Sequence, residues 1–527
     1  MKICFLLVFF IAIFACKPLS IAEQKAKLDE KIPAAFLLKD LDELYARLQK
    51  DHPFLYRYIS KEELEFKLDS IKKTIREPLS SKEFYPKVLF WVSQVRQGHL
   101  SASLPPLKYS KQEKNIRDKI KFPINQFDYY IENNKLFIKK NASKDSIISL
   151  GSEIVSIDNE NVESMLTNYK TLFASDGFNT TFKNRLLADR FSGFYNRNHD
   201  SKDSLTLELK LKDELKIMKI KKYFITNFKS KQDSLKHIDS INNFKKISKK
   251  LKKEILNKLK IQHERKNLYA YNKYENEFAR ELKFKENATA YLKINSFALP
   301  QYKKFYKEVF RKIDSAKTQN LIIDVRKNGG GNPKDIAELC SYLIDKPFYL
   351  VENAKLTSKF ALLKPAYGNQ NFLSKLFNFS YGFYAVLFKT KKVNNEFEYV
   401  MERKENQPKT NNFKGKIYII TSGMSFSATS IFASFMDGEK RATFVGEESG
   451  GDYNGTVAGR YYYYTLPNSK IKVNIGLMEV KTQYNQDIIG RGKLPDIELQ
   501  STLEEILTKK DREVEWIMNE ILTKKNN

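Results

Sequence analysis

A serine that could act as a nucleophile lies in Lys416–Asp437, where an apolar strand is predicted to pass through a Ser/Gly-rich turn into a helix. The apolar residues after Ser427 recur at the i, i+3, i+4 spacing of one helical face. Ser427 is therefore expected at the helix N-terminus, where free N–H groups and the helix dipole favour the negative charge of an alkoxide or an oxyanion. A second interpretation stays open, in which Ser425 and Ser427 are only N-caps.

A glycine run marks a second predicted strand, turn and helix, beginning with Leu321–Pro333. Gly329, Gly330 and Gly331 follow a short apolar strand, and glycines let a backbone approach a ligand closely. Such a loop can aim main-chain N–H groups at an oxyanion, although glycine runs are also typical of tight turns. The two units together favour a nucleophile beside an oxyanion-binding loop.

Four segments carry a family pattern: LIIDVRKNGGG, SFSATSIFASFMDGEKRATFVGEESGG, LPNSKIKV and GRGKLPDIEL. The first is similar to a D-x-R-x-N-G-G-G loop, the second to a nucleophile turn with its helix, and the last to a closing G-x-G-x-x-P-D-I signature. In these segments the chain resembles the tail-specific, or C-terminal-processing, serine peptidases, which include the tricorn protease core. The resemblance implies an α/β, ClpP/crotonase-like serine peptidase domain.

The resemblance also implies roles for individual residues. The nucleophile falls on Ser427, with Ser425 as the fallback if the turn is shifted by two residues. The oxyanion donors would be the N–H of Ala428 and one N–H from Gly329–Gly331. The implied reaction is acyl transfer from a peptide to water.

The general base departs from the common pattern of the family. Many members use a lysine after the serine, and the corresponding position here is Asp452. Because a serine hydroxyl needs a base within hydrogen-bond reach, another residue must serve. His99 lies in RQGHLS, which resembles the D-G-H-T turn of the family's histidine-using, tricorn-like branch, with Gln97 in place of the Asp. We expect His99 as the base, and His52, before a proline, as a cap or packing residue.

The third member of a triad, which would orient the imidazole, is less clearly marked. The tricorn-like branch supplies a Glu near the closing signature, where this chain has Ile489 before GRG. The nearest carboxylate in the sequence is Asp487, which we expect in this role. Glu447 is predicted to be a structural partner of the glycine-rich turn.

The length of 527 residues predicts about three domains, and the 42% apolar content is ample for buried cores. The helix and strand patterns, together with the family resemblance, imply an α+β and α/β multidomain fold. LGSEIVSIDNENVESML resembles a PDZ pattern, with Glu160 in place of the usual glycine. A PDZ fold binds extended peptides by strand addition, and a degenerate spacer is the alternative. The expected parts are a signal peptide at 1–15, a helical N-terminal domain at 16–120, a PDZ-like domain at 121–227, a basic helical linker at 228–285, the catalytic domain at 286–505 and a C-terminal helix at 506–527.

The N-terminal MKICFLLVFFIAIFAC has the charge, apolar run and length of a secretion signal. IFAC resembles a bacterial lipobox, which implies a lipid on Cys16, although Phe14 is bulky for its position; an uncleaved anchor is the alternative. We therefore expect a bacterial lipoprotein of the cell envelope, anchored in the periplasm or at the outer membrane. Cys340 would then have no disulfide partner, and no metal-ligand spacing is present, so we expect neither a metal nor another cofactor.

The formal net charge of +29 raises the question of a polyanionic partner. Phe244–Lys260 reads as a basic amphipathic helix, which could lie on an anionic membrane or pack its apolar stripe on the protein. No nucleic-acid motif accompanies it, and the export signal argues against nucleic acid. An aromatic-rich insertion at 355–411 could border the substrate cleft, touch a membrane or form a lid.

Two functions therefore compete. The first is an exported serine endopeptidase acting on proteins or peptides, and the second is a noncatalytic peptide-binding lipoprotein on the same scaffold. The distance between the His99 ring and Ser427 discriminates them, because a gap much beyond about 5 Å with no closing movement would remove most of the support for the enzyme. A third hypothesis is a basic protein that binds membranes or polyanions.

Overall fold

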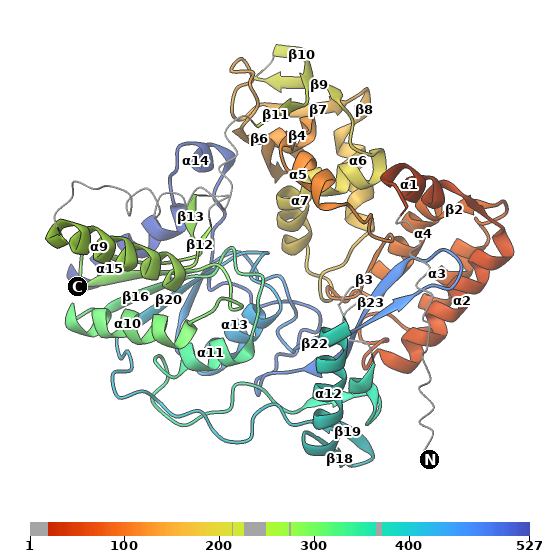
Figure 1. The fold of residues 1–527 in the computed structure, drawn as a ribbon. Coiled ribbons are helices and arrows are strands. Elements are labelled where there is room, and N and C mark those ends of the chain that lie inside the picture. Colours follow the sequence, from red (N-terminus) through yellow and green to blue (C-terminus); the bar gives the residue numbers. More distant parts are fainter. Residues whose placement is uncertain (1–18, 213, 226–248, 273–275, 365–371, 527) are drawn as a thin grey trace, which may run out of the picture.

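The computed structural model describes residues 19–212, 214–225, 249–272, 276–364 and 372–526. The expected signal peptide, Cys16 and the first part of the basic segment lie outside these residues. Figure 1 shows the described chain as three bodies: a helical one, a small sheet with helices packed on it, and a larger α/β body. Each body has its own buried apolar core.

The helical body contains the amphipathic helices that the sequence predicts. Leu37, Leu41, Leu44 and Leu48 follow the helical repeat and are fully buried. Four of its helices begin at a serine N-cap whose hydroxyl accepts the N–H of a glutamate three residues later. Its elements are α1 (Ile21–Asp29), β1 (Lys31–Ile32), α2 (Ala34–Asp51), α3 (Lys61–Lys72), β2 (Leu79–Ser80), α4 (Ser81–Ser93), β3 (Ser101–Ser103) and α5 (Lys111–Arg117).

The small sheet body has the antiparallel strand order β10-β9-β7-β6-β5, with β8 paired to β7. Apolar residues of β6, β7 and β9 point into the core, at alternate positions in β6 and β9, and α6 and α7 bury their apolar faces in the same core. Its elements are β4 (Ile120–Lys121), η1 (Pro123–Gln126), β5 (Phe127–Glu132), β6 (Lys135–Asn141), β7 (Glu153–Ile157), β8 (Glu160–Asn161), α6 (Val162–Thr171), α7 (Thr181–His199), β9 (Ser204–Leu211), β10 (Glu214–Lys221) and β11 (Tyr223–Phe224).

The α/β body is built on a sheet of order β14-β15-β16-β20-β21-β24, parallel from β15 onward. Alternate residues of each strand point to opposite faces, so one set packs with α10, α11 and α13 and the other with α15. The elements are α9 (Lys249–Leu268), β12 (Tyr271–Asn272), β13 (Glu277–Phe278), β14 (Arg280–Lys285), β15 (Thr289–Ile294), α10 (Tyr302–Ser315), β16 (Asn320–Asp324), α11 (Pro333–Cys340), β20 (Lys416–Thr421), α13 (Ala428–Gly438), β21 (Thr443–Gly446), β24 (Ile497–Glu498), α14 (Leu503–Leu507) and α15 (Arg512–Asn526).

A further sheet, of order β18-β19-β17-β23-β22, joins this body to the helical one. β3 pairs with β23, and Leu466, Ile471, Val473 and Ile475 lie in the core of the helical body. The turn between α4 and β3 is thereby fixed against the α/β body. The elements are β17 (Ala354–Leu356), η2 (Ala361–Leu363), α12 (Phe372–Phe388), β18 (Thr390–Val393), β19 (Glu396–Tyr399), β22 (Thr456–Thr465) and β23 (Lys472–Val480).

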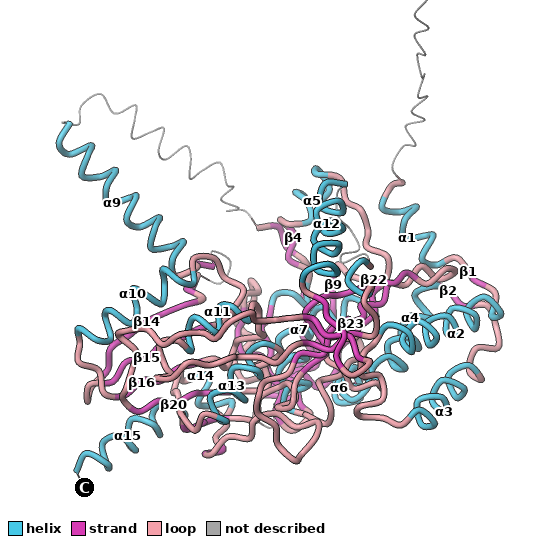
Figure 2. Tube along the Cα trace, turned by 90° about the horizontal axis from the view of Figure 1, so that it is seen from below, coloured by secondary structure: helices cyan, strands magenta, loops and turns pink. Residues whose placement is uncertain are grey.

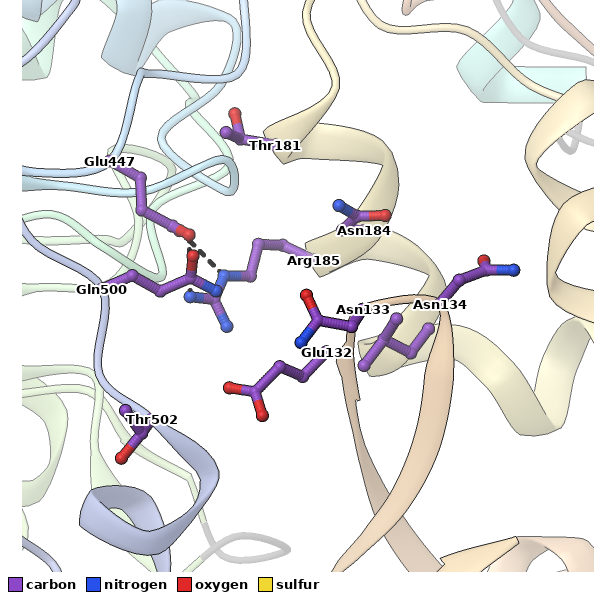
Figure 3. Close-up of a pocket in the computed structure, with 10 residues that line it drawn as sticks. Glu132, Asn133, Asn134, Thr181, Asn184, Arg185, Glu447, Gln500 and Thr502 are labelled. Atoms are coloured by element: carbon purple, nitrogen blue, oxygen red, sulfur yellow. Dashed lines mark hydrogen bonds and ion pairs between the residues drawn. The ribbon is translucent and has the colours of Figure 1, made fainter. Parts of the chain in front are cut away.

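Arg185 on α7 ties the small sheet body to the α/β body. Its guanidinium donates to both carboxylate oxygens of Glu447, over 2.8 and 2.9 Å, in the bidentate geometry that strengthens such pairs (Figure 3). Glu447 thus pairs with a helix of another body rather than with the glycine-rich turn beside it. The pair lines a cavity of about 420 Å³, with Glu132, Asn133, Asn134, Asn184, Gln500 and Thr502 among its other walls.

Candidate active site

The two turns singled out in the sequence meet at one edge of the parallel sheet. β16 and β20 are adjacent parallel strands, with Asp324 opposite Ile420, so the glycine loop and the serine turn both leave from their carboxyl ends. Ligand sites in open α/β sheets lie at this edge. Phe426 N–H donates to Asn328 O over 3.1 Å and links the two turns directly.

Ser427 occupies a strained backbone conformation. Its φ of 58° and ψ of −121° lie outside the regions open to residues with a Cβ, and the buried helix α13 follows immediately. A serine on a sharp strand-to-helix turn presents its hydroxyl outward, as in the nucleophile elbow of other hydrolases. The side chain makes no capping hydrogen bond, so the structure does not support the N-cap interpretation for Ser427.

Ser425 has a structural role. It is fully buried, its hydroxyl donates to Val325 O over 2.8 Å, and its Oγ accepts the N–H of Ser422 over 3.1 Å. These bonds hold the turn against β16. Of the two candidate serines, only Ser427 has a hydroxyl directed at an ionisable side chain.

That side chain is His99, whose Nε2 lies 2.8 Å from Ser427 Oγ. His99 comes from the turn between α4 and β3, and its carbonyl accepts the Asn474 amide over 3.0 Å. The ring of Phe426 lies 5.0 Å away, between centroids. The contact is within the reach that general-base catalysis requires, because hydrogen bonds between nucleophile and base span about 2.6–3.2 Å.

Gly98 allows this close packing. A Cβ at Gly98 would come within 2.5 Å of Phe426 Cζ, so only glycine lets the turn approach the ring unhindered. Its N–H donates to Asp176 Oδ1 over 2.8 Å. The G-H pair in the sequence is therefore a structural unit in which the glycine positions the histidine.

The second ring nitrogen of His99 does not meet Asp487. Nδ1 lies 3.2 Å from the hydroxyl of Tyr461 on β22, whereas the Asp487 side chain is exposed on a loop. The prediction of Asp487 as the third member is therefore wrong, and the hydroxyl of Tyr461 occupies that position. In the tautomer that a base requires, Nδ1–H donates to Tyr461 and Nε2 accepts the serine hydroxyl.

The oxyanion candidates divide into two groups. The N–H of Ala428 heads α13, and no acceptor among the described residues takes it. The N–H of Gly330 donates to Asn328 Oδ1 over 3.0 Å, and a Cβ there would come within 2.8 Å of Ala428 N. Gly330 therefore supports the serine turn, while the exposed Gly329 and Gly331 keep their N–H groups free of described acceptors.

Asp452, at the position where many family members carry lysine, belongs to a buried ionic network. Tyr58 donates to its carboxylate over 2.5 Å and Arg57 lies 3.2 Å away. Arg57 also pairs with Glu479 at 2.8 Å. This network joins the helical body to the α/β body. The Asp452 carboxylate is engaged in it and does not replace the lysine amine as a base for Ser427.

Two positions in the site carried no sequence signal. Tyr461 stands in a run of four tyrosines, of which Tyr462 and Tyr464 pack on the helical core. Strand alternation puts Tyr461 on the other face, but only the packing of β22 shows that this face meets His99. Asp176 is a loop carboxylate, and its burial behind the G-H turn depends on how the bodies dock.

Replacing Tyr461 with phenylalanine is expected to lower kcat about three- to tenfold and leave KM unchanged. The hydroxyl stabilises the imidazolium through one neutral hydrogen bond, which is worth roughly 1 kcal/mol. Steady-state kinetics on a peptide substrate would measure this. Tyr462→Phe, whose ring packs on the helical core, is the matched control; a rise in KM alone for Tyr461→Phe would contradict the assigned role.

Replacing Asp176 with asparagine is expected to stabilise the protein relative to the wild type, and this advantage should grow as the pH rises. Burial raises the pKa of Asp176 to about 6, whereas an aspartate in the unfolded chain has a pKa near 4. The folded wild type therefore loses stability as the pH rises from about 4 to about 6, because ionisation of the buried carboxyl is unfavourable. Asparagine keeps an acceptor for Gly98 N–H and cannot ionise. Relative to the wild type, its free energy of unfolding should increase by roughly 1–3 kcal/mol from pH 4 to pH 7. Urea unfolding measures this, with exposed Asp69→Asn as the control; a difference independent of pH would refute it.

Comparison with known proteins finds a family match over part of the chain. The model of Peptidase family S41 matches residues 288–499, which contain Ser427 and the glycine loop but not His99. The structure of mature CPAF superposes with a TM-score of 0.59 at 14% identity, covering 93% of this chain and 96% of that one. The structure of mature CPAF complexed with lactacystin superposes with a TM-score of 0.58 at 15% identity, covering 93% of this chain and 98% of that one.

At these identities the likeness to CPAF shows a shared fold over nearly the whole of both chains. No curated protein sequence matches the chain significantly. The matched range contains the strand ends, the glycine loop and the serine turn. Residues 288–499 of this chain thus match a domain of peptidase family S41.

Proposed function

We propose that the chain is an exported serine endopeptidase that hydrolyses proteins or peptides through an acyl-enzyme on Ser427, with His99 as the base. The observation that carries the proposal is the 2.8 Å contact between Ser427 Oγ and His99 Nε2. The two residues come from different bodies, and the backbone of Ser427 is strained where they meet. Strain of this kind costs on the order of 1–3 kcal/mol and persists at functional sites.

The proposed reaction has two half-steps. Ser427 Oγ attacks the scissile carbonyl carbon while its proton passes to His99 Nε2, and the oxyanion receives hydrogen bonds from Ala428 N–H and from Gly329 or Gly331 N–H. The imidazolium then protonates the leaving amine as the C–N bond breaks. Water attacks the acyl ester, His99 accepts its proton, and the new carboxyl group leaves as Ser427 regains its hydrogen.

Burial lowers the pKa of His99 to about 4, so the imidazole is neutral at pH 7 and free to accept the serine proton. A neutral tyrosine hydroxyl at Nδ1 stabilises the imidazolium less than a carboxylate would. We therefore expect a slower acylation step than a complete Ser-His-Asp triad would give.

We propose that the small sheet body is PDZ-like and helps to select extended substrates. Its sheet ends in β5 and β10, each of which pairs on one side only among the described strands. An edge strand can take up an extended peptide through main-chain hydrogen bonds. The contact between Arg185 and Glu447 would then couple this body to the catalytic one.

We further propose that the protein is held in the bacterial cell envelope by a lipid on Cys16. Support comes from the apolar leader and the IFAC sequence. Mass spectrometry of the N-terminal peptide from a membrane fraction tests this. A diacylglyceryl group on Cys16 is expected, and an unmodified cysteine or an intact leader would contradict it.

Digestion of a mixed peptide library, followed by mass spectrometry, tests the peptidase proposal. The wild-type protein should generate internally cleaved products, and a serine-directed phosphonate should suppress them. A noncatalytic peptide-binding protein would retain peptides intact and give no product above that of a Ser427→Ala preparation.

A further inference from the structure

Helix α12 exposes an unusual amount of aromatic surface. Eight large apolar or aromatic side chains on it are between 44% and 73% exposed: Leu376, Phe377, Phe379, Tyr381, Phe383, Tyr384, Leu387 and Phe388. Water-exposed rings in such density are rare on soluble proteins and mark a surface with a partner. The rings do not form a lid packed on a core, which was one of the interpretations open from the sequence.

The opposite face of α12 is firmly seated. Ala385 and Val386 are buried in the core of the α/β body. Gly382 lies so close to η2 that a Cβ would come within 2.5 Å of Leu362 O. Arg460 donates to Asn378 O over 3.2 Å. The aromatic face is therefore held outward by packing on its reverse side.

The chemistry of α12 matches the interface of a bilayer. Lys375 is its only charged residue in the sequence, and Lys389, Lys391 and Lys392 follow directly after its end. Tyr381 and Tyr384 add rings with polar tips, which favour the headgroup level. The helix has 17 residues, about 25 Å, and no helix of the described chain is long and apolar enough to cross a membrane.

Basic and N-terminal segments lie on the same side of the molecule. Figure 2 shows α9, α12 and α1 on the upper side, whereas α3 and α15 lie on the lower side. α9 carries eight Lys or Arg residues against two Glu, and its Leu256 and Ile261 are 38% and 64% exposed. The described chain begins just before α1, and the residues before it include the apolar leader.

We propose that the α12 face binds a lipid bilayer, with its rings inserted at the interface between headgroups and acyl chains and with α9 facing anionic headgroups. Basic flanks favour a membrane over a protein partner, because Lys and Arg beside an apolar helix face match anionic lipid. This contact is separate from a lipid on Cys16 and fixes which side of the protein faces the membrane. It does not depend on the peptidase activity.

Tryptophan replacements test the proposal in the full-length protein reconstituted into vesicles of phosphatidylcholine and phosphatidylglycerol. Phe383→Trp and Tyr384→Trp place probes on α12. Phe66→Trp, at a 71% exposed position on α3, is the matched control on the opposite side. Emission of the wild type, from Trp91 and Trp516, is subtracted.

Both α12 probes should shift to shorter wavelength with vesicles and lose most of their added emission when the acyl chains are brominated, while the α3 probe keeps its emission. Thermal unfolding confirms that each variant is folded. Unquenched α12 probes would overturn the proposal. So would a blue shift that appears without lipid and grows with protein concentration, because a second copy of the chain would then cover the face.

Discussion

Alanine at position 427 is expected to abolish peptide hydrolysis, with kcat/KM falling by about ten-thousandfold or more. In the proposed reaction the serine Oγ forms the acyl-enzyme, and the structure offers no second hydroxyl at 2.8 Å from His99 Nε2 among the described residues. The variant should fold normally, because Ser427 Oγ makes no helix-capping bond. Removing a Cβ substituent does not relieve the positive φ, so the turn should keep its shape.

Ser425→Ala is the matched control two residues away. Its hydroxyl holds the turn through Val325 O and Ser422 N, so its loss should lower the free energy of unfolding by roughly 1–3 kcal/mol. Activity per folded molecule should stay within about tenfold of the wild type. Peptide cleavage and urea unfolding measure these two effects. An inactive Ser425→Ala variant together with an active Ser427→Ala variant would contradict the assignment of the nucleophile.

His99→Ala is expected to lower kcat/KM by about a thousandfold or more, the second largest effect. Without the ring, no neutral base lies within hydrogen-bond reach of Ser427 among the described residues, and Asp452 is engaged with Tyr58 and Arg57. Adding this change to Ser427→Ala should cost little more, because the two residues act as one unit. Steady-state kinetics of the single and double variants measure this; additive losses would contradict it.

The pH dependence of the wild type follows from the same residue. His99 must be unprotonated to act as a base, and burial lowers its pKa to about 4. Activity should therefore stay level from pH 8 down to about pH 5 and fall below that, instead of falling near pH 6.5 as for an exposed imidazole. The dependence of kcat/KM on pH measures this fall at low pH. If a His99 variant that keeps some activity shows the same fall, a group other than His99 must cause it.

The catalytic turn was predictable because its chemistry is local. Ile417–Ile420, Ser427 and Gly329–Gly331 carry strand, turn and helix signals within short segments, and adjacent parallel strands bring such turns together. His99 was predictable from a two-residue pattern and the absence of a lysine. The observed contact confirms that the two residues are neighbours.

The environment of His99 was not predictable from local patterns. Tyr461 reaches Nδ1 because β22 lies between two bodies, and Asp176 reaches Gly98 N–H from the loop before α7. Both contacts depend on docking of segments remote in sequence. Asp487 was nearest along the chain to the expected position, yet its loop leaves it exposed. The strained φ of Ser427 is likewise set by tertiary packing.

The site therefore depends on the docking of three bodies. The helical body supplies His99, the α/β body supplies Ser427, β22 of the joining sheet supplies Tyr461, and the loop from the small sheet body supplies Asp176 behind the G-H turn. Movement at either junction would separate the base from the nucleophile. Anchorage through α12 would leave this arrangement intact, since Ala385 and Val386 of that helix are buried in the core of the α/β body.

The most direct measurement is the position of covalent labelling by a fluorophosphonate probe, mapped by tandem mass spectrometry on the full-length protein. The predicted result is a single label on Ser427 Oγ, with a labelling rate that falls by at least about a hundredfold in His99→Ala. A label that persists in Ser427→Ala and disappears in Ser425→Ala would contradict the proposed nucleophile, as would a wild-type protein that takes no label.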